Sequence, residues 1–479
     1  MKNIVICFFL AILIFSTASA QQSRNALPEI GVVASDAISI DKELQIGDVL
    51  MMQMRGQAPI VYDPVLEEYL NDLGNRLVAQ ADNVKFPFSF FWIKNSEINA
   101  FAFFGGHVGV HTGLINYADT ESELASVLAH EVSHVTQRHI ARRIAAQKKA
   151  SPLQIASMLG GILLAMADPE AGFAAISVGN AASQQFSINY TRSNEQEADR
   201  VAFRMMDLAG FETAGASAFF GKLVEKHRVQ SKPPAFLLTH PLPESRVADA
   251  RARENLYQRK QLPPSLPFHL VKARIQSRYT YDAKYNIAHY QSLIDKKTYV
   301  LKEAAMYGLA IAYYENEEVD KAHETLQPLL QKDPENLFYV DLATDIAISQ
   351  DRAALAVSNL SKLDKKIPKN QVISLNLANA AIKAGDYDKA IAVLKDYLLV
   401  NPDHMLSYQL LTDAYGGKKA FLQMHQAKAE WLALYAAYPN AIDELQTAYN
   451  YTGDSNIEKQ RIRARIEQLR TEQKRLETL

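Results

Sequence analysis

The residues of this chain best suited to chemistry lie close together, as His130, Glu131 and His134. They form an H-E-x-x-H sequence, and residues four apart share one face of a helix. On a helix both imidazoles can therefore bind one metal ion, with Glu131 placed to take a proton from a metal-bound water. A chance match on an amphipathic helix is the alternative interpretation, and the rest of the chain has to decide between the two.

The helix that must position these side chains is expected over residues 120–143. Thr120 and Glu123 have the T-x-x-E spacing of a capping box, which marks the start of a helix. Leu124 and Leu128 then begin an apolar stripe at helical spacing. The sequence thus predicts an amphipathic helix that carries the H-E-x-x-H residues.

A third metal ligand is expected on a second element. A catalytic zinc site usually has three protein ligands and keeps one position for water. The single cysteine, Cys7, lies near the N-terminus, so the ligand should be His, Asp or Glu. Residues 193–200 open a predicted helix on which Glu195 and Asp199 are four apart and share a face. Glu197 points away from that face, and we interpret it as a solvated charge.

Two strand-like segments precede the metal-binding helix. Residues 86–93 are crowded with aromatic side chains, which we interpret as core packing. Residues 99–112 contain a Gly-Gly turn followed by an alternation typical of a strand. In a peptidase, an exposed edge of that strand could receive the substrate as an added strand. His107 and His111 lie in this segment, but they are weaker ligand candidates than the residues above.

Composition and charge exclude some classes of protein. The chain has 479 residues, of which 48% are hydrophobic and 22% charged, as is typical of soluble proteins with two or three domains. A net charge of −2 argues against a general nucleic-acid binder, and we expect no nucleic-acid partner. Residues 1–20 have the basic start, the short apolar run and the A-x-A end of a cleaved signal peptide. An uncleaved anchor is the alternative.

The segment between the two metal-binding helices, residues 151–185, has two apolar runs. Each run is about ten residues or fewer, which is too short to span a bilayer. We expect a helical lid over the cleft. The alternative is a surface that touches a membrane protein or the bilayer.

The second half of the chain repeats with a period of 34 residues. The matched series are Pro334, Pro368 and Pro402; Ala322, Ala356 and Ala390; and Leu326, Leu360 and Leu394. This period is typical of tetratricopeptide repeats, which stack into a solenoid with a concave surface for a partner. A proline-rich stretch at 262–267 marks its start, and a charged amphipathic helix at 457–476 would cap its end. A passive scaffold is the alternative role.

The two metal-binding segments together resemble the gluzincin metallopeptidases, in the branch of the CAAX prenyl proteases and HtpX-like proteases. The N-A-F-A…G-G sequence before the first helix is similar to that branch, and so is the T-H-P sequence around His240 with Arg246 after it. The resemblance covers roughly residues 43–253. It implies one Zn2+ per chain. The implied ligands are His130, His134 and Glu195, and the implied general base is Glu131.

The same resemblance places three more residues at the site. Asp199 is implied to be a catalytic acidic partner, either a proton donor or an orienter of a ligand histidine. His240 and Arg246 are candidate donors to an oxyanion. His240 could instead occupy the open metal position and keep the enzyme inactive, or it could be a loop histidine held by flanking prolines.

The sequence therefore predicts a mostly helical α+β protein. We expect a signal peptide at 1–20, a zincin-type peptidase domain with a small sheet at 21–260, and a tetratricopeptide solenoid at 261–479. This architecture resembles that of periplasmic peptidases with chaperone-like duties in outer-membrane β-barrel assembly and quality control. The implied partners are misfolded or stalled outer-membrane proteins and the barrel-assembly machinery, the latter through the repeats, with peripheral contact to the outer membrane. The alternative is an envelope chaperone or scaffold whose metal site is autoinhibited or vestigial.

Overall fold

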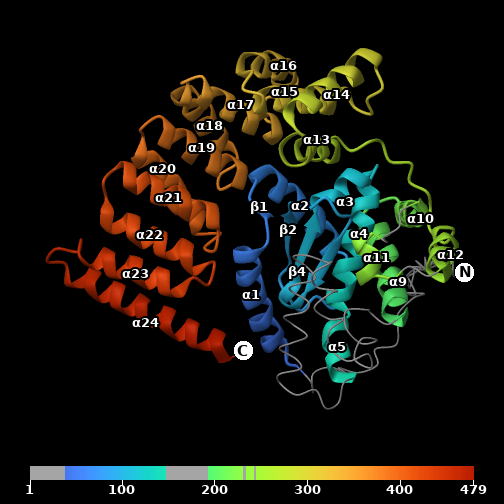
Figure 1. Ribbon diagram of the computed structural model, residues 1–479, viewed down its shortest axis with the longest axis horizontal. Helices are drawn as coiled ribbons and strands as arrows, with labels where there is room; N and C mark the ends of the chain where they lie inside the picture. Colours follow the sequence, from blue (N-terminus) through green and yellow to red (C-terminus); the bar gives the residue numbers. More distant parts are fainter. Residues whose placement is uncertain (1–37, 147–191, 230–233, 242–243, 479) are drawn as a thin grey trace, which may run out of the picture.

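The computed structural model describes residues 38–146, 192–229, 234–241 and 244–478. These residues form a mixed domain with one small sheet and a long helical solenoid that arcs around it (Figure 1). The expected α+β class with a helical solenoid is confirmed. The expected signal peptide and the expected lid at 151–185 both lie outside the described residues. Within the described ranges, no helix is both long enough and apolar enough to cross a membrane.

Four strands form one sheet in the order β1-β2-β4-β3. Their bounds are Ile60–Val61 for β1, Ser89–Ile93 for β2, Ala100–Phe103 for β3 and His107–His111 for β4. β2 and β4 are parallel, while β1 and β3 pair antiparallel at the two edges. The segment expected at 99–112 divides into β3 and β4 around the short helix η1, Phe104–Gly106. Gly106 has a φ of 84°, and a Cβ there would lie 2.2 Å from the carbonyl oxygen of Pro87, so the turn requires glycine.

Helices surround this sheet and make up the rest of the first domain. Their bounds are α1 Ile40–Gln57, α2 Pro64–Val78, α3 Thr112–Tyr117, α4 Glu121–Thr136, α5 His139–Ala146, α9 Arg192–Leu208, α10 Ala214–Val229, α11 Ala235–Thr239 and α12 Glu244–Glu254. α4 contacts β3 on one side and α2, α9 and α10 on others. Its interior residues are buried, which explains the apolar stripe of the sequence.

The start of α4 follows the prediction, and its end does not. Thr120 caps the helix by accepting a hydrogen bond from the backbone N–H of Glu123 at 3.3 Å. The Glu123 carboxylate accepts from the N–H of Asp119 at 2.7 Å, rather than from Thr120 as a reciprocal capping box requires. The single helix expected over 120–143 is wrong, because Arg138 has a left-handed φ of 51° and separates α4 from α5.

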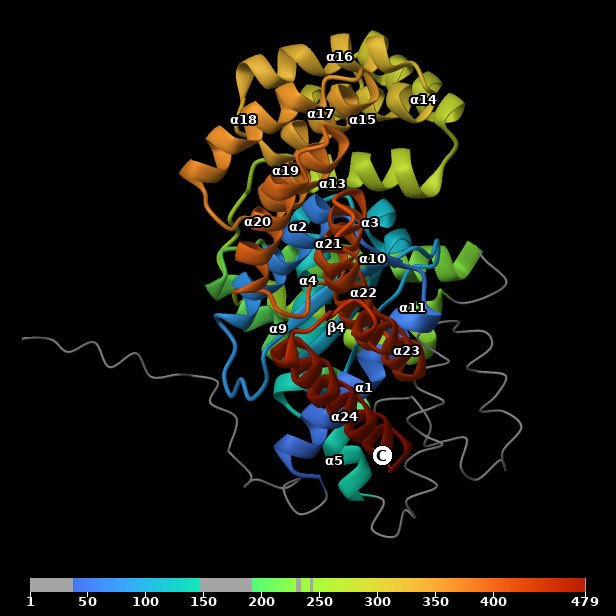
Figure 2. The ribbon, with the colours of Figure 1, turned by 90° about the vertical axis from the view of Figure 1, so that its left-hand side faces the viewer.

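The solenoid consists of antiparallel helix pairs. Its elements are α13 Leu266–Ile275, the π-helical turn η2 Gln276–Thr280, α14 Ala283–Lys296, α15 Lys302–Glu315, α16 Val319–Lys332, α17 Leu337–Ser349, α18 Ala353–Lys366, α19 Gln371–Lys383, α20 Tyr387–Leu398, α21 Met405–Gly417, α22 Phe421–Ala433, α23 Tyr438–Tyr449 and α24 Asn456–Thr478. All the alanines and leucines of the 34-residue series are buried between helices. The expected terminal helix is α24, which lies at the end of the arc near α1 (Figure 2).

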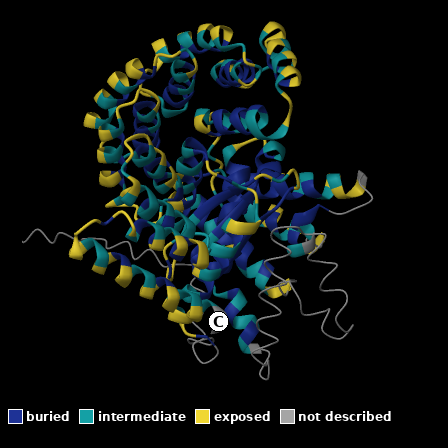
Figure 3. Ribbon diagram, turned by 60° about the vertical axis from the view of Figure 1, so that its left-hand side comes forward, coloured by how far each residue is buried: buried dark blue, intermediate teal, exposed yellow. Residues whose placement is uncertain are grey.

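The inner side of the solenoid lies against the first domain, and exposed residues gather on its outer side (Figure 3). α2 is the main contact, because it packs on α13, α17 and α19. Arg274 of α13 is fully buried there and donates to Asp63, which caps α2, at 2.7 Å. The same guanidinium reaches Asp341 of α17 at 2.7 Å and Tyr307 of α15 at 2.9 Å. One buried cation thus joins the two halves of the chain.

Candidate metal centre

The two histidines of α4 point their Nε2 atoms at a common place. These atoms are 2.9 Å apart, as expected for residues one helical turn from each other. Glu195, in the first turn of α9, places its carboxylate 3.3 Å from the Nε2 of His130 and 3.5 Å from that of His134. The three sequence-predicted ligands are therefore brought together, and all three are buried.

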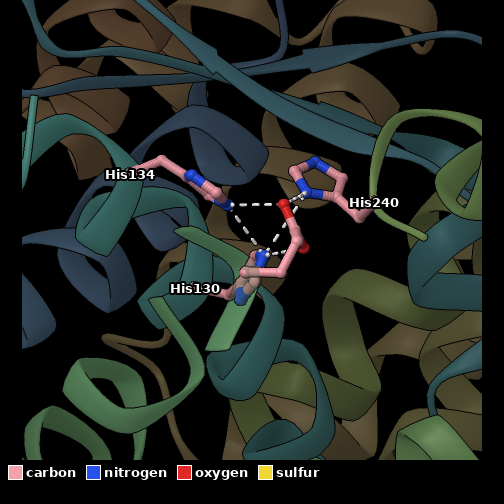
Figure 4. A group of neighbouring side chains, drawn as sticks. His130, His134 and His240 are labelled. Carbon is pink, nitrogen blue, oxygen red and sulfur yellow. Dashed lines mark hydrogen bonds and ion pairs between the residues drawn. The ribbon is translucent and has the colours of Figure 1, made fainter. Parts of the chain in front are cut away.

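His240 completes the cluster. It follows α11, a short helix that docks through a hydrogen bond from the N–H of Phe236 to the carbonyl of Ile98 at 3.0 Å. Its Nδ1 lies 3.3 Å from both the Nε2 of His130 and the Glu195 carboxylate. The three imidazoles face one another in Figure 4, and one donor atom from each of the four residues lies within 4.8 Å of the others.

Asp199 and Arg246 lie directly behind the ligands. The Asp199 carboxylate lies 3.0 Å from the Nδ1 of His130 and forms a two-pronged ion pair with Arg246, with both hydrogen bonds at 2.8 Å. Arg246 also reaches Glu195 at 2.7 Å and donates to the carbonyl of Pro241 at 2.7 Å. One guanidinium therefore fixes both carboxylates and the segment that carries His240.

The chemistry of this donor set fits a divalent cation. Tetrahedral zinc ligands at about 2.0–2.2 Å from the ion are roughly 3.3–3.6 Å apart, close to the separations here. Glu131, Glu195 and Asp199 are buried carboxylates, and Arg246 is the buried guanidinium paired with two of them. Two negative charges are left, which a divalent ion would balance while the histidines bind as neutral ligands.

The pKa shifts follow from these contacts. Burial alone would lower the pKa of His130, but hydrogen bonds to Asp199 and Glu195 outweigh it and raise this pKa to about 9. Burial would raise the pKa of Glu195, but His240 and His130 hold it well below its ordinary value. The pKa of Glu131 is raised by burial. Glu131 lies 3.3 Å from the Nε2 of His240, and a raised pKa suits a carboxylate that accepts a proton.

Two features of the site differ from the sequence interpretation. Glu197 is not a solvated charge, because its carboxylate lies 3.4 Å from the Nε2 of His139 and 3.0 Å from Arg142. His139 was not a sequence candidate, yet it is buried against His134. Its signal in the sequence is weak, since five-residue spacing does not place two side chains on one helical face.

The weaker candidates lie away from the cluster. His107 has its Nδ1 2.6 Å from the hydroxyl of Ser89 and belongs to the strand β4. His111 ends the same strand and stacks edge-on against Phe101. In the part of the chain that the structure describes, neither belongs to the group of four donors.

The sheet, the H-E-x-x-H helix, the glutamate from a second helix and the helical repeats define a metallopeptidase joined to a tetratricopeptide solenoid. Residues 64–254 match Peptidase family M48, and residues 304–336 and 347–414 match tetratricopeptide repeats. The chain belongs to peptidase family M48, in the group of the beta-barrel assembly-enhancing proteases.

Three relatives illustrate this membership. The beta-barrel assembly-enhancing protease of Escherichia coli (strain K12) is 42% identical over 475 residues, which are 99% of this chain and 97% of that protein. The protein of the same name from Yersinia pestis is 42% identical over 448 residues, covering 94% and 92%. The metalloprotease LoiP of Escherichia coli (strain K12) is 24% identical over 245 residues, covering 50% of this chain and 91% of LoiP.

Proposed function

We propose that this chain is a periplasmic zinc endopeptidase that acts on outer-membrane β-barrel proteins during their assembly and quality control. The observation that carries the proposal is the buried cluster of His130, His134, Glu195 and His240 with Glu131 against it. The names of the relatives that align along nearly the whole chain support the connection with barrel assembly. The signal-peptide pattern of residues 1–20 supports export.

In this proposal His130, His134 and Glu195 bind one Zn2+. The ion would lower the pKa of a bound water and polarise the scissile carbonyl. Glu131 takes the proton of the water and returns it to the leaving amine, a role for which its burial and raised pKa are suited. Asp199 keeps the Nδ1 proton of His130 in place, so we assign it an orienting role rather than proton donation to the substrate.

We assign His240 a regulatory role and Arg246 a positioning role. The Nδ1 of His240 lies among the ligand atoms, where it would take the position that a catalytic site keeps for water. Its Nε2 also faces Glu131, so the resting arrangement engages both the ion and the base. The guanidinium of Arg246 already donates to Asp199 and Pro241 and is paired with Glu195, which leaves it poorly placed to stabilise an oxyanion.

The proposed partners are barrel proteins that are misfolded or stalled, and the barrel-assembly machinery. Tetratricopeptide solenoids commonly bind other proteins, so we assign the machinery contact to the repeats. Work at that machinery would bring the chain into peripheral contact with the outer membrane. We also propose that the signal peptide ends at residue 20 and that the peptidase domain gives way to the solenoid after residue 260.

The deciding experiment compares degradation of a stalled outer-membrane barrel protein by the wild type and by Glu131→Gln. Glutamine keeps the shape of the side chain but cannot accept the proton, so we expect cleavage to fall by at least 1,000-fold. Zinc content measured on both proteins is the control, and we expect about one ion per chain in each. Equal degradation by the two proteins would refute the peptidase mechanism.

A chaperone or scaffold is the second candidate function, and the closed four-residue cluster favours it. If His240 holds the site shut, the resting protein binds clients without cutting them. We expect a scaffold role to appear as barrel assembly that survives in Glu131→Gln. Loss of assembly in that variant, with the protein folded and zinc-loaded, would leave proteolysis as the function.

A further inference from the structure

The chain turns directly after the metal-binding helix, and the turn places a third imidazole beside the site. α4 ends at Thr136, and Arg138 turns the backbone with its left-handed φ of 51°. Arg138 is held there by the buried carboxylate of Glu43 and by the carbonyl of Ile38 at 2.8 Å. His139 therefore lies beside His134, with the two rings edge to face and 4.8 Å between centroids.

The contact between these two rings determines where their protons lie. The Nδ1 atoms of His134 and His139 are 2.7 Å apart, so one nitrogen must donate and the other accept. The Nε2 of His134 faces the other ligand atoms and needs a lone pair to bind a cation. The proton of His134 is therefore on Nδ1, and the Nδ1 of His139 accepts it.

The remaining proton of His139 then lies on Nε2, and that atom faces Glu197. The Glu197 carboxylate lies 3.4 Å from the Nε2 of His139 and can accept a hydrogen bond from it. Arg142 donates to the same carboxylate at 3.0 Å and holds it in place. The hydrogen bonds from His134 through His139 to Glu197 therefore run in one direction, because each donor meets an acceptor. His130 is held differently, by the direct contact of its Nδ1 with Asp199 at 3.0 Å.

We propose that His139, backed by Glu197, is a positioning residue that fixes the ring orientation and the tautomer of the metal ligand His134. The inference rests on the metal site of the proposed function. It gives roles to His139 and Glu197, which are neither metal ligands nor the proposed base. Partners of this kind typically change metal affinity by about 10- to 100-fold when they are removed.

The test measures zinc affinity of the full chain by competition with a chromophoric chelator, for a pair of variants of equal shape. His139→Leu removes the acceptor, whereas His139→Asn can place its side-chain oxygen where Nδ1 lies. We expect zinc to bind about 10- to 100-fold more weakly to His139→Leu and within about threefold of wild type to His139→Asn. His269→Leu, a histidine of α13 outside the site, should leave zinc affinity unchanged.

Cobalt(II) in place of zinc gives a second readout, because its visible absorption reports ligand geometry. We expect an altered spectrum in His139→Leu and a spectrum like that of wild type in His139→Asn. Equal zinc affinities in the Leu and Asn variants, or a Leu variant within threefold of wild type, would overturn the inference. Failure of the wild type itself to bind zinc would overturn the proposed metal site, and the inference with it.

Glu197→Ala covers the case in which His139→Leu does not fold. Glu197 is partly exposed, and it reaches the metal ligands only through its contact with His139. We expect its removal to weaken zinc binding by more than threefold, while Glu225→Ala, an exposed carboxylate of α10, has no effect. An unchanged affinity in Glu197→Ala would contradict the proposed chain of hydrogen bonds.

Discussion

The two ring nitrogens of His240 contact different parts of the site. Nδ1 lies among the metal-ligand atoms, and Nε2 lies against the proposed base Glu131. Its ring also stacks on Phe236 with 4.7 Å between centroids, so the closed arrangement is well packed. Opening the site therefore requires the imidazole to leave both Phe236 and the ligand atoms.

A His240→Ala variant should have higher peptidase activity than the wild type. Removing the imidazole frees the position for water and releases Glu131, so we expect at least a several-fold increase in the rate of cleavage of an unfolded barrel protein. His227→Ala, an exposed histidine on α10, is the control. Unchanged or lower activity in His240→Ala would leave a catalytic or packing role for this residue.

Arg246→Leu should destabilise the protein even without metal. The substitution leaves Glu195 and Asp199 as buried carboxylates without their cation, and breaking such a pair typically costs about 3–5 kcal/mol. Denaturant unfolding of the metal-free protein measures this loss. Arg251→Leu, an exposed position of the same helix α12, should change the free energy of unfolding by less than about 0.5 kcal/mol. Similar stabilities for the two variants would contradict the assigned role.

The residues of the site could be predicted from the sequence where helical periodicity applies. His130, His134, Glu195 and Asp199 lie on two helices, and four-residue spacing identifies the shared faces. His139 could not be predicted, because its position depends on the left-handed turn at Arg138. The environment of Glu197 depends on the contacts of His139 and Arg142 in α5 with α9, and no local pattern contains that information.

The short helix η1 is fixed in place by an unusually close approach of α1. A Cβ added to Gly47 of α1 would lie 2.1 Å from the carbonyl oxygen of Phe104. η1 lies between β3 and β4, and the backbone of Ala102 in β3 faces the carboxylate of Glu131. The helix α1, which is far from the metal ligands in sequence, therefore sets the position of β3 beside Glu131.

Gly47→Ala should lower stability by about 1–3 kcal/mol or more, because the methyl group would overlap backbone that cannot move freely. Peptidase activity should fall as well, since β3 is displaced from Glu131. Gly56→Ala in the same helix is the matched control, because no atom lies within 4 Å of its added Cβ. That variant should be unchanged or up to about 1 kcal/mol more stable, through the helix propensity of alanine. Thermal and denaturant unfolding of both variants would check the pair.

The whole molecule depends on contacts that sequence patterns predict poorly. The 34-residue period identified the solenoid, because repeats impose their own spacing. It could not show that α2 is packed against the inner helices, or that Arg274 meets Asp63 across 211 residues of sequence. Such contacts arise from the curvature of the complete solenoid, which is a sum of small rotations between repeats.

Asp63→Asn tests this junction. Burial raises the pKa of Asp63, but the charges of Arg274 and Arg278 outweigh burial and hold it below the ordinary 3.8. The ionised carboxylate thus contributes stability that is full above about pH 3.8 and is lost as the pH falls through the lower, folded pKa. Asparagine keeps the helix cap, so the expected loss of about 3 kcal/mol at pH 7 reports the ion pair.

Denaturant unfolding at pH 7 and at pH 3 should show the stability difference between wild type and Asp63→Asn shrinking in acid. Asp82→Asn, which removes an exposed pair with Arg204, is the control and should cost less than about 1 kcal/mol. A difference that stays constant or grows as the pH falls would contradict the ionised state assigned to Asp63.

The helix α13 contributes side chains to both hydrophobic cores, which limits the order in which the two halves of the chain can fold during synthesis. Phe268, Val271 and Ile275 fill the core of the peptidase half, while Leu270 and Ala273 fill that of the solenoid. A chain that emerges N-terminus first cannot complete its peptidase core until residue 275 has emerged. The peptidase half therefore completes its core only as the first helix of the solenoid forms, so the two halves of the chain cannot mature independently.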